Sequence, residues 1–201
     1  MGEATLRSFI KKSVTLKPYN KWYVYVLIII IANLIAGGFN TVFRQSLIGI
    51  KPFYLPSASN VPTLLVGDQV IVDLRKKSPI KGTFIVFKFP DDPKKDYLKR
   101  VIAIENDSLE IKNKHVFVNN IMLNESYSVH EDNKILPKNV SSRDNFGPIQ
   151  IPSGKIFVMG DNRDHSFDSR FFGSIDKTAI IGTALYIYWA RDKKRVGMLI
   201  Q

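Results

Sequence analysis

Cysteine is absent from this chain, and histidine occurs only three times, as His115, His130 and His165. The lack of cysteine excludes disulfides, thiolate nucleophiles and zinc sites built on cysteine, and such a chain tolerates either redox compartment. The histidines include no pair at metal-ligand spacing, and no glycine-rich loop suits a phosphate group. We therefore expect no metal and no cofactor.

Basic runs interleaved with aromatic residues are also missing, although 29 Lys and Arg against 18 Asp and Glu give a net charge of +11. Such an excess suggests an acidic partner, either nucleic acid or an anionic membrane face, or only a solvated basic surface. Without the aromatic interleaving we expect no nucleic-acid partner. The 201 residues suffice for one sizeable domain, with or without a small insertion.

A long apolar run is present near the N-terminus, where residues 22–39 read WYVYVLIIIIANLIAGGF. No charged residue occurs between Lys21 and Arg44, and a spanning helix needs about 20 mostly apolar residues. A cleaved targeting peptide would have a shorter apolar core, and a buried core helix is rarely apolar on all sides over such a length. The run therefore predicts a single transmembrane anchor over 22–39, with the lipid bilayer as a partner.

Positive charges are distributed unequally about this run. The positive-inside rule places the more basic flank in the cytoplasm, so residues 1–21 are expected there and residues 40–201 on the other side. In a bacterium that side is the periplasm or the outer face of the plasma membrane. The basic residues before the run are Arg7, Lys11, Lys12, Lys17 and Lys21, and those shortly after it are Arg44 and Lys51.

Long amphipathic helices are missing after Arg44, and short alternating runs bounded by turn residues take their place. We therefore expect a mainly β domain. Residues 124–147 are polar and predict a long surface loop or the edge of an inserted subdomain. Strands are predicted at 69–74, 83–89, 97–104, 155–159 and 179–190, with a hairpin over 109–118 that turns near Asn113.

Three separated segments carry the candidate chemistry: 56–64 (PSASNVPTL), 96–102 (DYLKRVI) and 160–173 (GDNRDHSFDSRFFG). We interpret them as one site assembled from three places in the fold. Ser59 is the candidate nucleophile, and a serine hydroxyl attacks poorly until a base takes its proton. A triad of His165, Ser166 and Asp168 is poor geometry, because adjacent residues of an extended segment point to opposite faces.

Lys99 is the alternative base. In a strand over 97–104 it shares one face with Tyr97, Val101 and Ala103, while Arg100 points away. Burial on that apolar face would lower the pKa of the amine toward working pH. The competing interpretation is an ordinary surface lysine, and this segment alone does not decide between them.

The three segments together, in this order behind a single apolar run, resemble the type I signal peptidases. The resemblance covers the chain from the anchor to about Trp189. It rests on Pro-Ser-x-Ser-x-x-Pro-Thr-Leu, Tyr-x-Lys-Arg and Gly-Asp-Asn-Arg-Asp-x-Ser-x-Asp-Ser-Arg-x-x-Gly. It implies a twisted antiparallel β-sheet or barrel with a small β insertion at about 105–155.

The same resemblance implies a membrane-bound serine endopeptidase that removes signal peptides from exported preproteins through a Ser/Lys dyad and an acyl-enzyme. Ser59 would be the nucleophile and Lys99 the general base. Ser57 would complete the oxyanion hole with the Ser59 backbone N–H, and Ser166 would orient the lysine. Supporting roles fall to Asp161, Asn162, Arg163 and an Asp168–Arg170 pair.

The substrate implied is a preprotein with an Ala-x-Ala cleavage site, bound as an added strand. Open alternatives are a conjugation-type peptidase with one dedicated substrate and an inactive membrane-tethered peptide-binding module. One departure lies beside the nucleophile, where Asn60 replaces the usual methionine. The pocket walls implied by the resemblance are Phe53, Leu55, Pro56, Val70, Val86, Tyr97 and Leu98.

Overall fold

The computed structural model describes residues 23–32 and 49–200, in two units that we treat separately. Residues 23–32 are helical. Within the described ranges, no helix combines the length and the apolar character needed to cross a membrane. The basic segment 1–21 and most of the predicted anchor 22–39 lie outside the described residues, so both remain predictions.

The second unit is built from antiparallel strands, which confirms the mainly β prediction. The short helical pieces are η1 (Arg163–His165), α2 (Ser169–Phe172), η2 (Lys177–Ala179) and η3 (Lys193–Arg195). The strands are β1 (Ile50–Tyr54), β2 (Gln69–Asp73), β3 (Phe84–Phe89), β4 (Asp92–Ile104), β5 (Ser108–Lys112), β6 (His115–Val118), β7 (Ile121–Met122), β8 (Phe146–Gln150), β9 (Lys155–Met159), β10 (Ile175–Asp176) and β11 (Ile180–Trp189).

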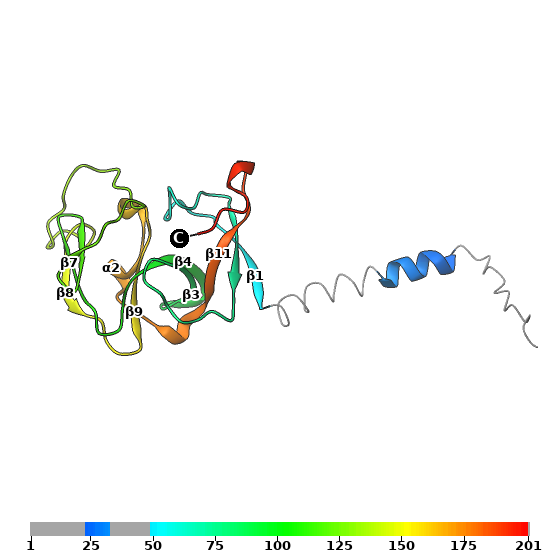
Figure 1. The fold of residues 1–201 in the computed structure, drawn as a ribbon, viewed down its shortest axis with the longest axis horizontal. Helices are drawn as coiled ribbons and strands as arrows, with labels where there is room; N and C mark the ends of the chain where they lie inside the picture. The colour runs from blue at the N-terminus through cyan, green and yellow to red at the C-terminus, as the bar shows by residue number, and fades with distance from the viewer. Residues whose placement is uncertain (1–22, 33–48, 201) are drawn as a thin grey trace, which may run out of the picture. The chain divides into compact units, whose positions relative to one another are not determined.

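Seven strands form the larger sheet in the order β1-β2-β11-β3-β4-β9-β10 (Figure 1). Successive side chains of a strand point to opposite faces of the sheet. In the central strand β3, buried side chains lie on both faces. In β3, Phe84 and Val86 pack into one core cluster, while Ile85 and Phe87 pack into another on the opposite face. This double burial accounts for the nearly continuous apolar run of that strand.

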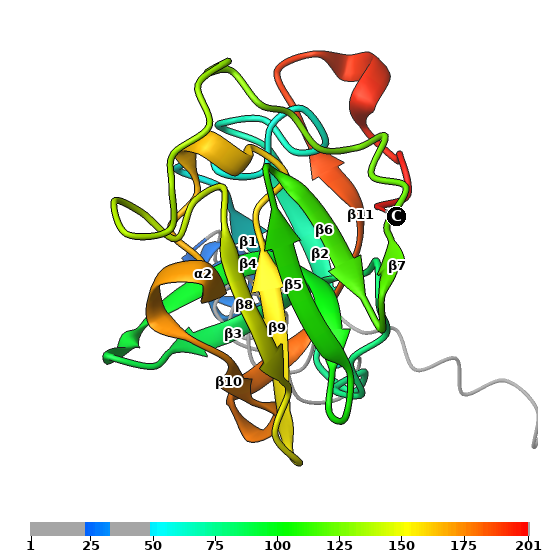
Figure 2. The same ribbon diagram turned by 90° about the vertical axis from the view of Figure 1, so that its left-hand side faces the viewer.

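The smaller sheet has the order β7-β6-β5-β8 and lies between β4 and β9 in the chain, within the range expected for the insertion (Figure 2). The predicted hairpin is confirmed: Asn113 and Lys114 have φ values of 48° and 73°, as a tight β-turn requires. A core cluster that includes Phe157 of β9 and Leu109 of β5 joins the two sheets.

Strand β4 has two halves with different neighbours. Its first half, from Asp92 to Arg100, pairs with β3, whereas β9 pairs with it only from Arg100 onward. The residues before Arg100 therefore have a strand on one side only, and this open stretch includes Lys99. The prediction that Ala103 shares the Lys99 face is wrong, because a register shift between Val101 and Ala103 moves it into the cluster with Ile102.

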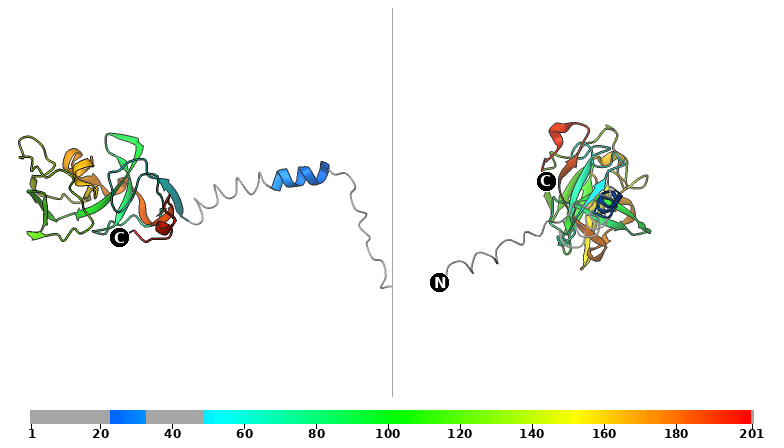
Figure 3. Two further views of the ribbon diagram at one scale, coloured as in Figure 1. Left: turned by 90° about the horizontal axis from the view of Figure 1, so that it is seen from above. Right: turned by 90° about the vertical axis from the view of Figure 1, so that its right-hand side faces the viewer.

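The C-terminal segment returns along β11. Tyr186 forms an isolated bridge with Leu199, and the Ile200 backbone N–H donates to Leu185 O at 2.9 Å. Figure 3 shows this segment, in red, turning back at the end of the strand. Arg195 then reaches Asp68 at 2.8 Å, which ties the C-terminal turn to the loop between β1 and β2.

Candidate active site

The Ser59 loop begins directly after β1. Ser59 is only 9% exposed, and its hydroxyl oxygen lies 3.2 Å from that of Ser57. A backbone hydrogen bond from Leu64 N to Asn60 O, 2.9 Å long, closes the turn that follows. The Ser59 hydroxyl is therefore held by an ordered loop, beside a second hydroxyl.

Lys99 enters the same site from the open half of β4. The residue is only 4% exposed. Burial lowers the pKa of the amine from 10.5 to about 8, because the charged form loses its hydration. The Asp168 carboxylate acts in the opposite direction, and Arg170 adds to the lowering. A substantial fraction of the amine is thus neutral near pH 8.

Gly160 brings the third segment against the first. The backbone N–H of Asn162 donates to Ser59 O at 3.2 Å. A Cβ atom at Gly160 would clash with both Ser59 O and the Ser166 hydroxyl. Only glycine therefore permits this close approach of the two segments.

Ser166 is buried beside that glycine. Its hydroxyl oxygen has no hydrogen-bond partner of good geometry among the described residues, so the expected bond to the Lys99 amine is not formed. The hydroxyl is nevertheless close enough to the Asp168 carboxylate to help lower the pKa of that carboxyl. Ser166 thus lies buried within the third segment, beside Gly160, without the partner predicted for it.

Asp168 and Arg170 form the expected pair, with Arg170 Nη2 donating to Asp168 Oδ2 at 2.8 Å. Burial alone would raise the pKa of the Asp168 carboxyl, but the charge and hydrogen bonds of Arg170 hold it below its ordinary value. Arg170 also donates to the backbone oxygens of Arg163 and Arg143, at 2.7 and 2.8 Å. The pair therefore ties the end of the third segment to Arg163 within the same segment and to Arg143 of the polar loop before β8.

Asp161 joins all three segments. Its carboxylate accepts two hydrogen bonds from Arg100 of β4, at 2.8 and 2.7 Å, and one from Thr63 of the Ser59 loop, at 2.5 Å. The Arg100 guanidinium is buried between the rings of Phe84 and Tyr127, at 4.3 and 3.8 Å from their centroids. Because Arg100 follows Lys99 directly, this buried pair fixes the backbone that presents the lysine.

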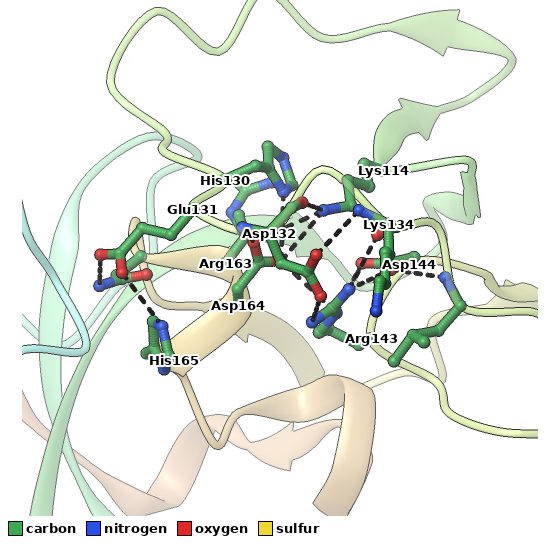
Figure 4. A network of polar contacts seen from close by, with 12 residues as sticks. Lys114, His130, Glu131, Asp132, Lys134, Arg143, Asp144, Arg163, Asp164 and His165 are labelled. Atoms are coloured by element: carbon green, nitrogen blue, oxygen red, sulfur yellow. Dashed lines mark hydrogen bonds and ion pairs between the residues drawn. The ribbon is translucent and has the colours of Figure 1, made fainter.

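The polar loop before β8 is tied to the third segment by the network in Figure 4. Asp164 accepts from the Asp132 backbone N–H at 2.8 Å and lies 3.4 Å from both Lys114 and Arg143. Arg143 also pairs with Asp144 at 2.7 Å. The predicted surface loop thus supports the neighbouring site segment.

Asn162 and Arg163 of the third segment also contact the polar loop before β8. Arg163 pairs with Glu125 at 2.6 Å. Asn162 forms an isolated bridge with Val129, and its side chain donates to Glu131 at 3.1 Å. Arg163 and Asn162 therefore have structural contacts, in keeping with the supporting roles expected for them.

A cavity of about 350 Å³ lies where the segments meet, and both Ser59 and Lys99 line it. Val70 does not: it is 0% exposed and packs into the core cluster that includes Leu64 and Val86, so its assignment to the pocket is wrong. The other predicted walls do line it, namely Phe53, Leu55, Pro56, Val86, Tyr97 and Leu98. Lining residues that the sequence analysis did not assign to the pocket are Tyr54, Asn60, Asp96, His165 and Phe167.

His165 and Phe167 lie on either side of Ser166, but this spacing alone did not indicate that they line the cavity. His165 ends the 3-10 turn η1, however, so strand alternation does not apply to it. His165 Nε2 lies 3.1 Å from Glu131, and Asp168 is bound to Arg170. The side chains of His165 and Asp168 therefore do not form a catalytic triad with Ser166.

Within residues 23–32 and 49–200, no cluster of His, Asp and Glu is arranged to hold a metal ion.

Comparison with known proteins gives consistent similarities. Residues 22–189 match the family described as "Signal peptidase, peptidase S26". The chain is 32% identical over 192 residues to signal peptidase I U of Bacillus subtilis (strain 168), covering 92% of this chain and 97% of that protein. It is 31% identical to signal peptidase I of Bacillus licheniformis, over 88% of this chain and 93% of that protein. It is 28% identical to a probable signal peptidase I-2 of Synechocystis, over 99% of this chain and 86% of that protein.

Replacing Lys99 by methionine should stabilise the protein at neutral pH. Since the pKa falls from 10.5 to about 8 on folding, the unfolded chain binds more protons between these values, and stability rises with pH across that window. The penalty is full below the folded pKa and amounts to about 3 kcal/mol. Urea unfolding should show Lys99→Met to be more stable at pH 7, with the difference shrinking toward pH 10. Equal differences at both pH values would contradict a buried amine, and Lys112→Met, at an exposed lysine, is the control.

Replacing Asp161 by alanine should destabilise the protein strongly, because it leaves the buried Arg100 guanidinium unpaired. Removing one partner of a buried ion pair costs about 3–5 kcal/mol. The measurement is the free energy of unfolding in urea. Asp176→Ala, which breaks an exposed pair with Lys155, is the matched control and should change stability little. If both variants lose the same small amount, Asp161 does not hold the segments together.

Proposed function

Because this chain belongs to the signal peptidase family, peptidase S26, we propose that it is a serine endopeptidase that removes N-terminal signal peptides from exported preproteins. The names of its relatives support the removal of signal peptides. One observation carries the chemistry: the buried Lys99 amine, with a pKa of about 8, lines the same cavity as the Ser59 hydroxyl.

In the proposed reaction, the neutral Lys99 amine takes the proton of Ser59 as its oxygen attacks the scissile carbonyl carbon. The tetrahedral intermediate collapses, the C–N bond breaks, and Lys99 returns the proton to the leaving amine. Water then attacks the resulting ester, with the same lysine as base, and frees the serine. A base with a pKa near working pH serves both transfers.

Stabilisation of the oxyanion is assigned to Ser57 and to the backbone N–H of Ser59. The Ser57 hydroxyl, 3.2 Å from the Ser59 hydroxyl, is near enough to reach an oxygen on the carbon that Ser59 attacks. One such donor contributes roughly 3–4 kcal/mol of transition-state stabilisation. Ser166 is assigned to orient the lysine, which requires its buried hydroxyl to meet the amine during the reaction.

The substrate is proposed to bind as an extended strand between the end of β1 and the open half of β4. Both elements line the cavity, and among the described strands only β3 pairs with β4 before Arg100. An added strand gains backbone hydrogen bonds, while pockets for alternate side chains give selectivity. The apolar walls Phe53, Val86 and Leu98 suit the apolar side chains of an Ala-x-Ala site.

Attachment to the bacterial plasma membrane is also proposed, through a single helix over 22–39 with its N-terminus in the cytoplasm. The support is the uncharged run between Lys21 and Arg44 and the basic segment before it. The catalytic domain would then act in the periplasm or outside the cell. This location would bring the site to a preprotein whose own apolar segment is still in the bilayer.

The rate of preprotein cleavage should rise with pH through the pKa of Lys99. With a value of about 8, the neutral fraction of the amine grows ~10-fold between pH 7 and pH 9. We expect kcat/KM for a model preprotein in detergent to rise by that factor and then level off. The product should be mapped by mass spectrometry at each pH. A rate that falls over this range would contradict a neutral lysine base.

The controls separate catalysis from binding. Ser59→Ala and Lys99→Ala should each abolish cleavage while they still bind the preprotein, whereas Lys112→Ala, at an exposed lysine outside the cavity, should behave as wild type. Cleavage that survives in both site variants would refute the mechanism. Binding without cleavage in the wild type would favour an inactive peptide-binding module. Cleavage of one dedicated substrate only would favour the conjugation-type enzyme.

A further inference from the structure

Tyr127 of the polar loop before β8 covers the guanidinium of Arg100. The central carbon of that group lies 3.8 Å from the centroid of the Tyr127 ring and 4.3 Å from that of Phe84. Phe84 belongs to β3, the strand beside β4, whereas Tyr127 comes from a loop remote in sequence. With both rings in place, Arg100 is only 1% exposed.

The nitrogen atoms of the same guanidinium are all engaged. Arg100 Nε and Nη2 donate to the Asp161 carboxylate at 2.8 and 2.7 Å, and Nη1 donates to Gly82 O at 2.5 Å. A guanidinium forms hydrogen bonds in its own plane and stacks its faces on aromatic rings. The Tyr127 ring therefore takes a place that water would otherwise occupy over the cation.

The Tyr127 ring is itself held in position. Its hydroxyl donates to Glu125 Oε1 at 3.1 Å, and that carboxylate accepts from Arg163 at 2.6 and 2.9 Å. Two backbone hydrogen bonds, from Val129 N to Asp161 O and from Arg163 N to Val129 O, fasten the loop two residues further on. The polar loop therefore presents this ring from a fixed position.

The ion pair beside the ring determines where the lysine lies. Arg100 follows Lys99 in β4, and its partner Asp161 also accepts from Thr63 of the Ser59 loop at 2.5 Å. Exclusion of water strengthens such a pair, because the surrounding dielectric constant is lower. Water at the guanidinium would weaken the connection between β4, the Ser59 loop and the third segment, and the Lys99 amine would regain hydration.

We propose that Tyr127 is a positioning residue for the cleavage reaction: its ring keeps water away from the Arg100–Asp161 pair and thereby keeps Lys99 buried. The inference rests on the proposed function and gives the polar loop a part in it. Tyr127 is not among the residues that line the cavity with Ser59 and Lys99, so it acts through Arg100.

Hydration is the largest influence on the Lys99 amine. Its burial lowers the pKa more than any neighbouring charge changes it, and the opposing effect of Asp161 is smaller. A better hydrated amine must therefore have a higher pKa. The charged and titratable groups around it are Asp161, Asp168 and Arg170 of the third segment and Asp96 and His165 of the cavity wall.

Tyr127 stays uncharged below pH 10, because burial raises the pKa of its phenol above the ordinary value of 10.0. The ring itself therefore adds no titration to the pH range of the test. The charged groups near it are Glu125, Arg163, Arg100 and Lys81.

The test compares Tyr127→Ala, which uncovers the guanidinium, with Tyr127→Phe, which keeps the ring. Values of kcat and KM for a model preprotein are measured from pH 7 to pH 10. In Tyr127→Ala the midpoint of the profile should rise by about one unit, so kcat at pH 7 should fall about tenfold and recover by pH 10. KM should change little. Tyr127→Phe should stay within about twofold of the wild type throughout, because the ring still covers the cation.

A general loss of folded enzyme would lower kcat by the same factor at every pH, so the midpoint separates positioning from stability. Tyr188→Ala, at a tyrosine that is 53% exposed, is the matched control and should keep the wild-type profile. An unchanged midpoint in Tyr127→Ala overturns the inference, and so does an equal shift in Tyr127→Phe. If Tyr127→Ala does not fold, Tyr127→Leu takes its place, and an unchanged midpoint there overturns the inference too. Absence of cleavage by the wild type would instead count against the proposed function.

Discussion

The burial of one amine is the constraint on which the site depends. Lys99 lies on the half of β4 that has a strand on only one side, yet it is 4% exposed because the Ser59 loop and the third segment close over it. Removing its hydration lowers the pKa to about 8. An exposed lysine would stay protonated at that pH and could not act as a base. The proposed chemistry therefore requires the three segments to stay packed.

Buried ion pairs keep that packing in place. Asp161 binds Arg100 beside the lysine and Thr63 in the serine loop, and Asp168 binds Arg170 at the end of the third segment. These charges are costly to bury unless they are fully paired. Their value here is positional: Asp161 joins segments that are distant in the sequence, and Arg170, held by Asp168, reaches the Arg143 carbonyl of the polar loop. Gly160 completes the arrangement, because only its lack of a side chain lets the third segment reach Ser59 O.

The sequence predicts those parts of the fold and of the site that a local pattern of residues determines. Alternation placed strands β2, β3, β9 and β11 correctly, and the resemblance brought Ser59 and Lys99 to one cavity. Strand β1 was missed because its Pro52 cannot donate to a ladder, which suits an edge strand and weakens the pattern. The charged first half of β4 gave no strand signal either. Val70 was misassigned because its side chain packs inside a core cluster with Val86 and Ala184, and a single sequence does not reveal which members of a cluster reach the cavity.

The most direct test of the central claim is the titration of the Lys99 amine itself. Lysine amines labelled with ¹³C-methyl groups by reductive methylation can be followed by NMR against pH, and Lys99→Arg identifies the signal. The account predicts a midpoint near pH 8 for this amine. A midpoint near 10.5, the value of a hydrated lysine, would show that the amine is not held in a dry site and would contradict the account.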